Sequence, residues 1–291
     1  MYRLMLKWDS AFHLNRSSPT RLRSAFIELS CPATANPERV IDTLQQSTLL
    51  CSTILPVPPS RAALTRLGST ENRYRVTFSV ADTEHLASTK DLLLRHSRRQ
   101  LYHSGLYFPR AAQNDATTDE SADRRFHSVL PLLRDIILFE ALNAGQLATI
   151  AAELRPRSLE PGEVLFAQGG SEATLFIVAS GILEISQLIE LIGQLTVGYI
   201  GAGDYIGEIS LLTGESYAAT ATARTHCNVF ELGRNVIGPL LAANSSLYAE
   251  FDRSARRGLA VLHRGAAVSA TDDSARQSLL HRIRRFFDDP N

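Results

Sequence analysis

The chain of 291 residues has little of what marks secreted proteins, metalloproteins or strongly charged nucleic-acid binders. Its 3 cysteines, Cys31, Cys51 and Cys227, are odd in number and lack the spacing of a metal site, which favours a reducing compartment. Basic and acidic residues balance at 30 each, so no net charge draws the chain to nucleic acid or anionic lipid. We expect no metal, no cofactor and no nucleic-acid partner.

A secretion signal and an uninterrupted apolar run are also missing. Residues 1–7 are too few and too mixed in character for a signal peptide. The longest apolar stretch, Leu175 to Ile200, contains Glu184 and Glu190, whereas a membrane span needs about 20 mostly apolar residues. Two buried strands joined by a turn are the better interpretation.

The composition is that of a folded protein with more than one domain. Hydrophobic residues make up 44% and charged residues 21% of the chain, and the length favours two domains. Residues 111–124 are small and polar and predict a linker. We expect five segments in order: an irregular entry (1–23), a first domain (24–110), the linker (111–124), a second domain (125–265) and a tail with a short basic amphipathic helix (266–291).

The first domain is predicted as strand, helix, strand, strand, helix and short strand. Residues 74–80 alternate between apolar and polar side chains, which is typical of a strand. Asn36 is expected to cap the first helix, and Asp82 to cap a helix from Thr83 to about His103. A short strand is expected at Leu106–Pro109. This order is that of a ferredoxin-like fold, so the fold class is α+β.

The second domain is organised around residues 201–221. A glycine-rich turn leads to Gly207, and Glu208 then opens a short helix whose amides can meet an anion. Its carboxylate can accept from a pair of hydroxyl groups. The alternative, that Glu208 only stabilises the start of the helix, stays open because acids are favoured in a first turn.

Gly207-Glu208-Ile209-Ser210-Leu211-Leu212, followed by Ala218-Ala219-Thr220, resembles the phosphate-binding cassette of the cyclic nucleotide-binding domain. The resemblance implies a jelly-roll-like β-roll with flanking helices, in which Glu208 accepts from the ribose 2′-hydroxyl and the last helix covers the base. The candidate ligand-binding residues lie at the start of the short helix and in the segment that follows it. They are Gly207, Glu208, Ile209, Ser210, Tyr217, Ala218, Ala219 and Thr220.

Tyr217 stands where this family carries the arginine that pairs with the cyclic phosphate. The amides of Ala218 and Ala219 can still donate to phosphate oxygens, but a charge-assisted pair contributes about 1.5–3 kcal/mol. Its loss lowers affinity about ten- to a hundredfold, because about 1.4 kcal/mol is a factor of ten. We predict that a cyclic nucleotide, cyclic AMP in preference to cyclic GMP, binds weakly or not at all, or that the pocket takes another ligand.

The first domain carries a second resemblance. The prolines at 56–59, the strand beginning at Asn72, and Leu101-Tyr-His-Ser-Gly-Leu-Tyr-Phe-Pro109 resemble the cytoplasmic α/β domain of small-conductance mechanosensitive (MscS-like) channels. The resemblance implies a homo-oligomeric ring, a heptamer, on the cytoplasmic side of a bacterial inner membrane, with the pore outside this chain. An unrelated ferredoxin-like module is the alternative.

Other functions fit the residues less well. Gly214-Glu-Ser216-Tyr-Ala218 approaches the nucleophile elbow of an esterase, but alternating strand–helix units are missing and Ala218 replaces the last glycine. A DNA-binding regulator needs a helix-turn-helix after the last helix of the β-roll, and only 26 residues follow Gly265. A stand-alone cyclic nucleotide-binding signalling protein stays open. No catalytic residue is predicted.

Overall fold

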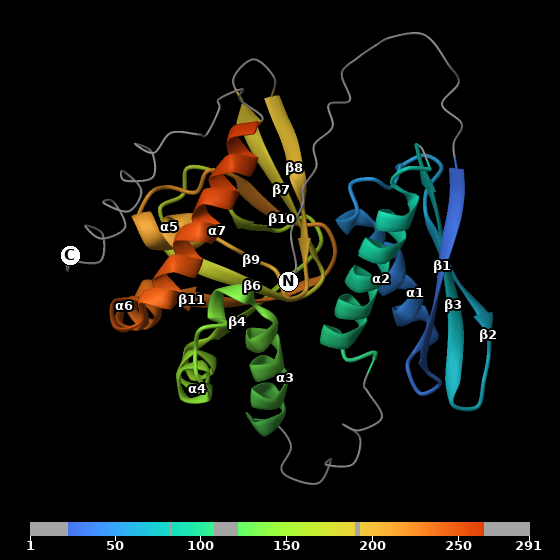
Figure 1. The fold of residues 1–291 in the computed structure, drawn as a ribbon, viewed down its shortest axis with the longest axis horizontal. Coiled ribbons are helices and arrows are strands. Elements are labelled where there is room, and N and C mark those ends of the chain that lie inside the picture. The colour runs from blue at the N-terminus through green and yellow to red at the C-terminus, as the bar shows by residue number, and fades with distance from the viewer. Residues whose placement is uncertain (1–22, 82, 108–121, 190–192, 265–291) are drawn as a thin grey trace. The chain divides into compact units, whose positions relative to one another are not determined.

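The computed structural model describes residues 23–81, 83–107, 122–189 and 193–264 (Figure 1). The chain divides into two compact units, residues 1–116 and residues 117–291. Almost all of the predicted entry segment, most of the linker and the tail helix lie outside the described residues. Among the described helices, none combines the length and the apolar character that a membrane crossing requires.

The described part of the first unit is an antiparallel sheet in the order β1-β3-β2, with helices packed on one face (Figure 1). Its elements run in the predicted order: β1 (Arg23–Pro32), α1 (Pro37–Ser47), the 3-10 turn η1 (Thr48–Leu50), β2 (Arg61–Arg66), β3 (Glu71–Val80) and α2 (Leu86–His103). Alternation along β3 buries Tyr74, Val76 and Phe78 against the helices. Asn36 caps α1 as predicted, since its side chain accepts from the amides of residues 38 and 39.

Two predictions for this unit were wrong at the ends of α2. The helix begins at Leu86 rather than Thr83, because residues 83–85 form a turn in which the Leu86 amide donates to the Thr83 carbonyl. Leu106 and Tyr107 are not in a strand. Both of their amides donate to the Leu101 carbonyl, at 2.9 and 3.1 Å, and this closes the end of α2 instead of extending the sheet. Asp82, Phe108 and Pro109 lie outside the described residues.

The second unit contains, over the part of it that is described, two four-stranded sheets, β5-β10-β7-β8 and β4-β11-β6-β9, with flanking helices. The strands are β4 (Arg155–Leu159), β5 (Val164–Phe166), β6 (Thr174–Ser180), β7 (Ile182–Ile189), β8 (Gly193–Gly201), β9 (Tyr205–Ile206), β10 (Thr220–Ala223) and β11 (Cys227–Gly233). The helices are α3 (Ala122–Asp135), the 3-10 turn η3 (Ile137–Phe139), α4 (Ala144–Glu153), α5 (Glu208–Thr213), α6 (Arg234–Ala243) and α7 (Ser245–Arg264).

The apolar stretch from Leu175 to Ile200 runs through β6, β7 and β8, so its interpretation as buried strands is confirmed, with one strand more than the two expected. Gly181 turns the chain between β6 and β7 with a φ of +87°. Glu184 on β7 is accommodated because its carboxylate accepts from the Thr196 hydroxyl of β8 at 2.8 Å. The interrupting acid therefore marks a cross-strand contact in the β-roll.

Two apolar cores hold this unit together. One lies between the sheets and contains Phe166, Phe176 and Tyr217. The other lies under the helices, where Leu211 and Leu212 of α5 pack in one cluster with Phe251 of α7. The apolar side of the short helix α5 thus packs in the helical core. Glu208, the first residue of α5, lies where α5 contacts α7.

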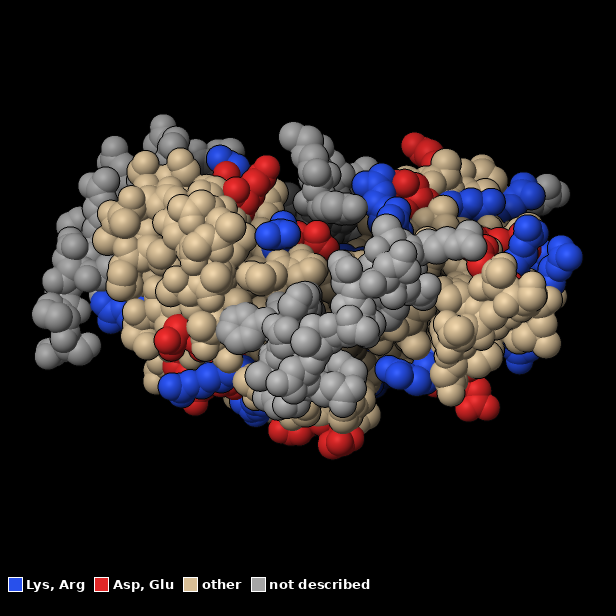
Figure 2. Space-filling view, turned by 90° about the horizontal axis from the view of Figure 1, so that it is seen from below, with Lys and Arg blue, Asp and Glu red and all other residues tan. Residues whose placement is uncertain are grey.

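On the face drawn in Figure 2, basic and acidic side chains are interspersed over both units. Exposed pairs such as Arg75–Glu28, with 2.8 Å between nitrogen and oxygen, contribute about 0–1 kcal/mol each. The fold of each unit is therefore stabilised mainly by its own apolar core.

Candidate functional site

The cassette at residues 207–220 begins at a position that requires glycine. Gly207 precedes α5 with a φ of +97°, and a Cβ at this position would lie 2.3 Å from the Thr174 carbonyl oxygen of β6. Gly214 ends the same helix with a φ of +69°. These two glycines fix α5 between β9 and β10, so that Glu208 is the first helical residue.

Glu208 is buried, with 7% of its surface exposed. Burial raises the pKa of its carboxyl group to about 7, against the lowering effects of the Glu208 and Gly207 amides and of the Arg257 charge. Such a carboxylate has lost most of its water and gains from any further hydrogen-bond donor. This is the chemistry that the prediction of a hydroxyl acceptor requires.

The helix α7 covers this carboxylate directly. A Cβ at Gly258 would lie 3.0 Å from Oε1 of Glu208 and 3.2 Å from Cδ1 of Ile209. A second contact joins the same surfaces, where the Tyr205 hydroxyl and the Ser254 hydroxyl lie 2.8 Å apart. The predicted acceptor therefore faces the last described helix of the unit and not open solvent.

Ile209 and Ser210 have structural roles in this arrangement. Ile209 is half-buried and packs against the helical core, next to Gly258. Ser210 is buried, and its hydroxyl donates to the Glu215 carbonyl, which closes the turn after α5. The structure places both residues in the cassette, but the Ser210 hydroxyl is engaged within it.

Tyr217 lies in the core between the sheets. Its ring stacks on Phe166 with 4.0 Å between centroids and an interplanar angle of 25°, and 5% of its surface is exposed. Its amide donates to the Gly170 carbonyl at 2.7 Å, and its hydroxyl reaches the Thr174 carbonyl at 3.4 Å. Burial raises the pKa of Tyr217 to about 12. The side chain at the arginine position is therefore a packed aromatic.

The last three predicted residues leave the cassette toward β10. Ala218 is exposed and its carbonyl accepts from Nε2 of Gln187 at 3.0 Å, whereas Ala219 is buried. The Thr220 hydroxyl oxygen accepts from the Gln168 amide at 3.0 Å. These bonds tie the exit of the cassette to β7 and to the turn after β5.

Sequence reasoning missed the residues that face the cassette from α7. Gly258, Ser254 and Arg257 were not singled out, although a glycine inside an amphipathic helix is unfavourable by about 1 kcal/mol relative to alanine and signals a close approach. Gln168 and Gln187 belong to no recognisable sequence motif. Their contacts join strands far apart in sequence and became visible only in the folded chain.

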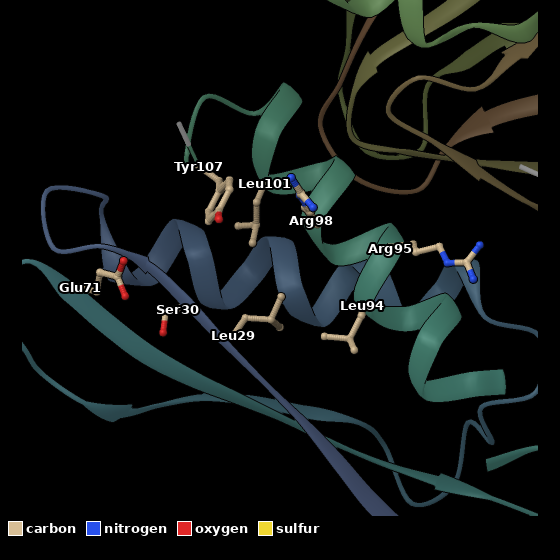
Figure 3. A pocket seen from close by; sticks show the side chains of 8 residues that line it. All are labelled: Leu29, Ser30, Glu71, Leu94, Arg95, Arg98, Leu101 and Tyr107. Carbon is tan, nitrogen blue, oxygen red and sulfur yellow. The ribbon is translucent and has the colours of Figure 1, made fainter. Parts of the chain in front are cut away.

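A hollow of about 440 Å³ lies in the first unit, between β1 and α2 (Figure 3). Leu29, Leu94 and Leu101 form its apolar lining, and Arg98 and Tyr107 lie at its rim. It contains none of the predicted site residues. In the described part of the chain β1 pairs with β3 alone, so the hollow borders the open edge of the sheet.

Comparison with known proteins places the family match in the second unit. Residues 156–244 match the model of the cyclic nucleotide-binding domain. The cAMP-dependent protein kinase regulatory subunit of Mycosarcoma maydis is 35% identical over 104 residues, which cover 36% of this chain and 20% of that protein. Potassium channel AKT3 of Oryza sativa subsp. japonica is 26% identical over 122 residues, or 40% of this chain and 14% of that protein.

A solved structure with the same kind of likeness is the N-terminal domain of a transcriptional regulator from Streptomyces coelicolor A3(2). It is 25% identical, covers 47% of this chain and 99% of that domain, and has a TM-score of 0.38. The chain spans a fifth or less of the length of the two curated relatives. The family match does not extend to the first unit, so it gives no support to the resemblance with mechanosensitive channels.

Proposed function

We propose, since residues 156–244 match the model of the cyclic nucleotide-binding domain, that this chain is a ligand-sensing regulatory protein whose signal leaves the β-roll through α7. Glu208 is the acceptor for ligand hydroxyl groups, and Gly207, packed against the Thr174 carbonyl of β6, fixes its position. The protein performs no catalysis in this account. Its output is a change in the position of one helix.

The observation that carries this function is the contact between α5 and α7. Because a Cβ at Gly258 would be 3.0 Å from Oε1 of Glu208, no ribose fits between them as they stand. A hydroxyl group that binds Glu208 must displace α7 from this contact. Ligand binding and the seated position of α7 are then competing states, and a ligand shifts their populations by its differential affinity.

A cyclic nucleotide is a weak ligand in this proposal, with cyclic AMP ahead of cyclic GMP. The ring of Tyr217 is packed on Phe166 at 4.0 Å and replaces the arginine that would neutralise the phosphate. A tyrosine hydroxyl returns at most one neutral hydrogen bond. Here that hydroxyl already reaches the Thr174 carbonyl at 3.4 Å.

We further propose that the first unit is a ferredoxin-like module of an MscS-like channel protein, at the cytoplasmic side of a membrane, and that it forms a homo-oligomeric ring. The order β1-α1-β2-β3-α2, with β3 between β1 and β2, supports this assignment. The motif from Leu101 to Pro109 is its second support. A stand-alone regulatory protein with the same β-roll is the alternative.

Calorimetric titration with cyclic AMP and cyclic GMP tests the binding function. We expect weak binding by the unaltered protein, a gain of about ten- to a hundredfold in Tyr217→Arg, and loss of that gain in Tyr217→Arg combined with Glu208→Gln. Thermal unfolding verifies that each variant is folded. Tight binding by the unaltered protein contradicts the role of Tyr217, and a folded Tyr217→Arg without any gain contradicts the assignment of the cassette.

A further inference from the structure

The end of the cassette that would hold a phosphate is filled by an aromatic cluster. Phe166, Phe176 and Tyr217 lie with centroids 4.0 to 6.4 Å apart, and Tyr217 is 5% exposed. The Tyr217 amide, a further donor at this end, is taken by the Gly170 carbonyl at 2.7 Å. A phosphate placed here would lose water and receive no charged partner from position 217.

The charges around this end are also unfavourable to an anion. After burial, the charged groups that raise the Tyr217 pKa are two carboxylates, Glu172 and Glu231. Arg157 pairs with Glu231 at 3.4 Å and with Glu163 at 3.7 Å, so the charges of Arg157 and Glu231 largely cancel and Glu172 supplies the remaining negative charge. An anionic ligand would therefore meet the like charge of Glu172.

The end that would hold a sugar keeps its chemistry. Glu208 is a buried carboxylate beside Arg257, whose positive charge acts on that carboxylate. Two carboxylate oxygens match a vicinal diol, which offers two donors. A 3′,5′-cyclic nucleotide has only its 2′-hydroxyl free, because the phosphate occupies the 3′ and 5′ oxygens. A nucleoside has both the 2′- and the 3′-hydroxyl free.

We propose, resting on the ligand-binding function proposed above, that the natural ligand of the site at Glu208 is an uncharged ribonucleoside, held through its 2′,3′-diol by Glu208, and not a cyclic nucleotide. The packed ring of Tyr217 and the carboxylate of Glu172 reject the phosphate, so the site accepts a nucleoside in preference to a nucleotide. The specificity comes from repulsion at one end and from hydroxyl recognition at the other.

Calorimetry on the full chain compares adenosine with cyclic AMP, guanosine with cyclic GMP, and adenosine with 2′-deoxyadenosine. We expect at least one ribonucleoside to bind ten times more tightly than its cyclic phosphate or better. Removal of the 2′-hydroxyl, and Glu208→Gln, each lower the affinity at least tenfold. Glu153→Gln, at an exposed position of α4 outside the cassette, is the matched control and leaves binding unchanged.

Two variants separate this inference from the function on which it rests. Glu172→Gln, at an exposed position, is expected to raise cyclic AMP affinity severalfold and to leave adenosine affinity unchanged. A cyclic nucleotide that binds the unaltered protein more tightly than its nucleoside overturns the inference, and so does failure of both nucleosides to bind. If Tyr217→Arg then gains cyclic AMP affinity, the cassette assignment stands and only the ligand class is wrong. If it gains none, both fail.

Discussion

Gly258 of α7 and Glu208 of α5 meet closely, since a Cβ at Gly258 would lie 3.0 Å from Oε1 of the carboxylate, nearer than an ordinary van der Waals contact. Glycine inside a helix is unfavourable by about 0.5–1 kcal/mol relative to alanine. The close approach of the two helices explains why a glycine occupies position 258. Because of this contact, Glu208 becomes accessible to a ligand only when α7 moves away from α5.

A larger side chain at position 258 is expected to shift that equilibrium. In Gly258→Leu the new side chain meets Glu208 and Ile209, so α7 lifts from α5 and exposes the carboxylate. We expect faster amide hydrogen exchange at residues 251–258 and tighter ligand binding. Ala249→Leu, at an exposed position of α7, is the matched control and leaves exchange unchanged. Equal exchange rates in the two variants would show that the contact between Gly258 and Glu208 does not hold α7 in place.

The pH dependence of stability reports the burial of Glu208. Burial raises the pKa of this carboxyl group from 4.5 to about 7, with Arg257 of α7 and the Gly207 and Glu208 amides opposing the shift. Tyr205 of β9 also faces the group and is itself neutral in this range, since burial raises its pKa to about 12. Between pH 4.5 and about 7 the folded state therefore binds more protons than the unfolded state, and stability falls as pH rises.

Glu208→Gln removes this dependence. Chemical denaturation at pH 5 and at pH 8 is expected to show that the unaltered protein loses about 2–3 kcal/mol more than Glu208→Gln over this interval. The two proteins should differ most in slope midway between the unfolded and folded pKa values, near pH 6. Parallel pH profiles for the two would mean that Glu208 is not desolvated.

Tyr217 is expected to matter for stability through its ring and hardly at all through its hydroxyl. Tyr217→Phe keeps the stack on Phe166 and loses only a 3.4 Å hydrogen bond, so a change of less than about 1 kcal/mol is expected. Tyr217→Ala leaves a cavity in the core between the sheets and is expected to lower the free energy of unfolding by about 3–5 kcal/mol. Urea denaturation of both variants measures this, and similar losses would contradict the packing described here.

Gly207 and Gly162 form a matched pair with positive φ angles of +97° and +89°. A Cβ at Gly162 meets nothing within 4 Å, whereas a Cβ at Gly207 would lie 2.3 Å from the Thr174 carbonyl oxygen. Gly162→Ala should therefore lower the free energy of unfolding only by the backbone term of about 1–2 kcal/mol. Gly207→Ala should lower it by more and also abolish ligand binding. Equal destabilisation would show that the close approach to β6 is unimportant.

Local features of this fold were predictable because their causes are local. Asn36 caps α1 as expected, and Asn143 with Gln146, three positions apart in the chain, forms a capping box at the start of α4. The cassette could be located because its glycines, its acid and its small residues follow one another in the chain. The start of α2 was misplaced by three residues, which is the usual uncertainty where a turn precedes a helix.

The parts that could not be predicted depend on long-range contacts. Tyr217 was expected beside a ligand, but its ring packs on Phe166, about fifty positions earlier in the chain, and nothing near Tyr217 in sequence indicates this. Gly258 contacts a carboxylate fifty positions away. Such pairings are set when the sheets and helices close over a common core. They decide whether the cassette is open to ligand, which its own residues do not determine.

Hydrogen exchange of α7 in the ligand-bound protein tests the central claim most directly. Tyr217→Arg saturated with cyclic AMP, or the unaltered protein saturated with the ribonucleoside that binds it, is compared with the same protein without ligand. Competition for Glu208 predicts faster exchange of the amides from Ser254 to Gly258 when ligand is bound. Slower or unchanged exchange of these amides, with binding established by calorimetry, would contradict the claim that ligand and α7 compete for one carboxylate.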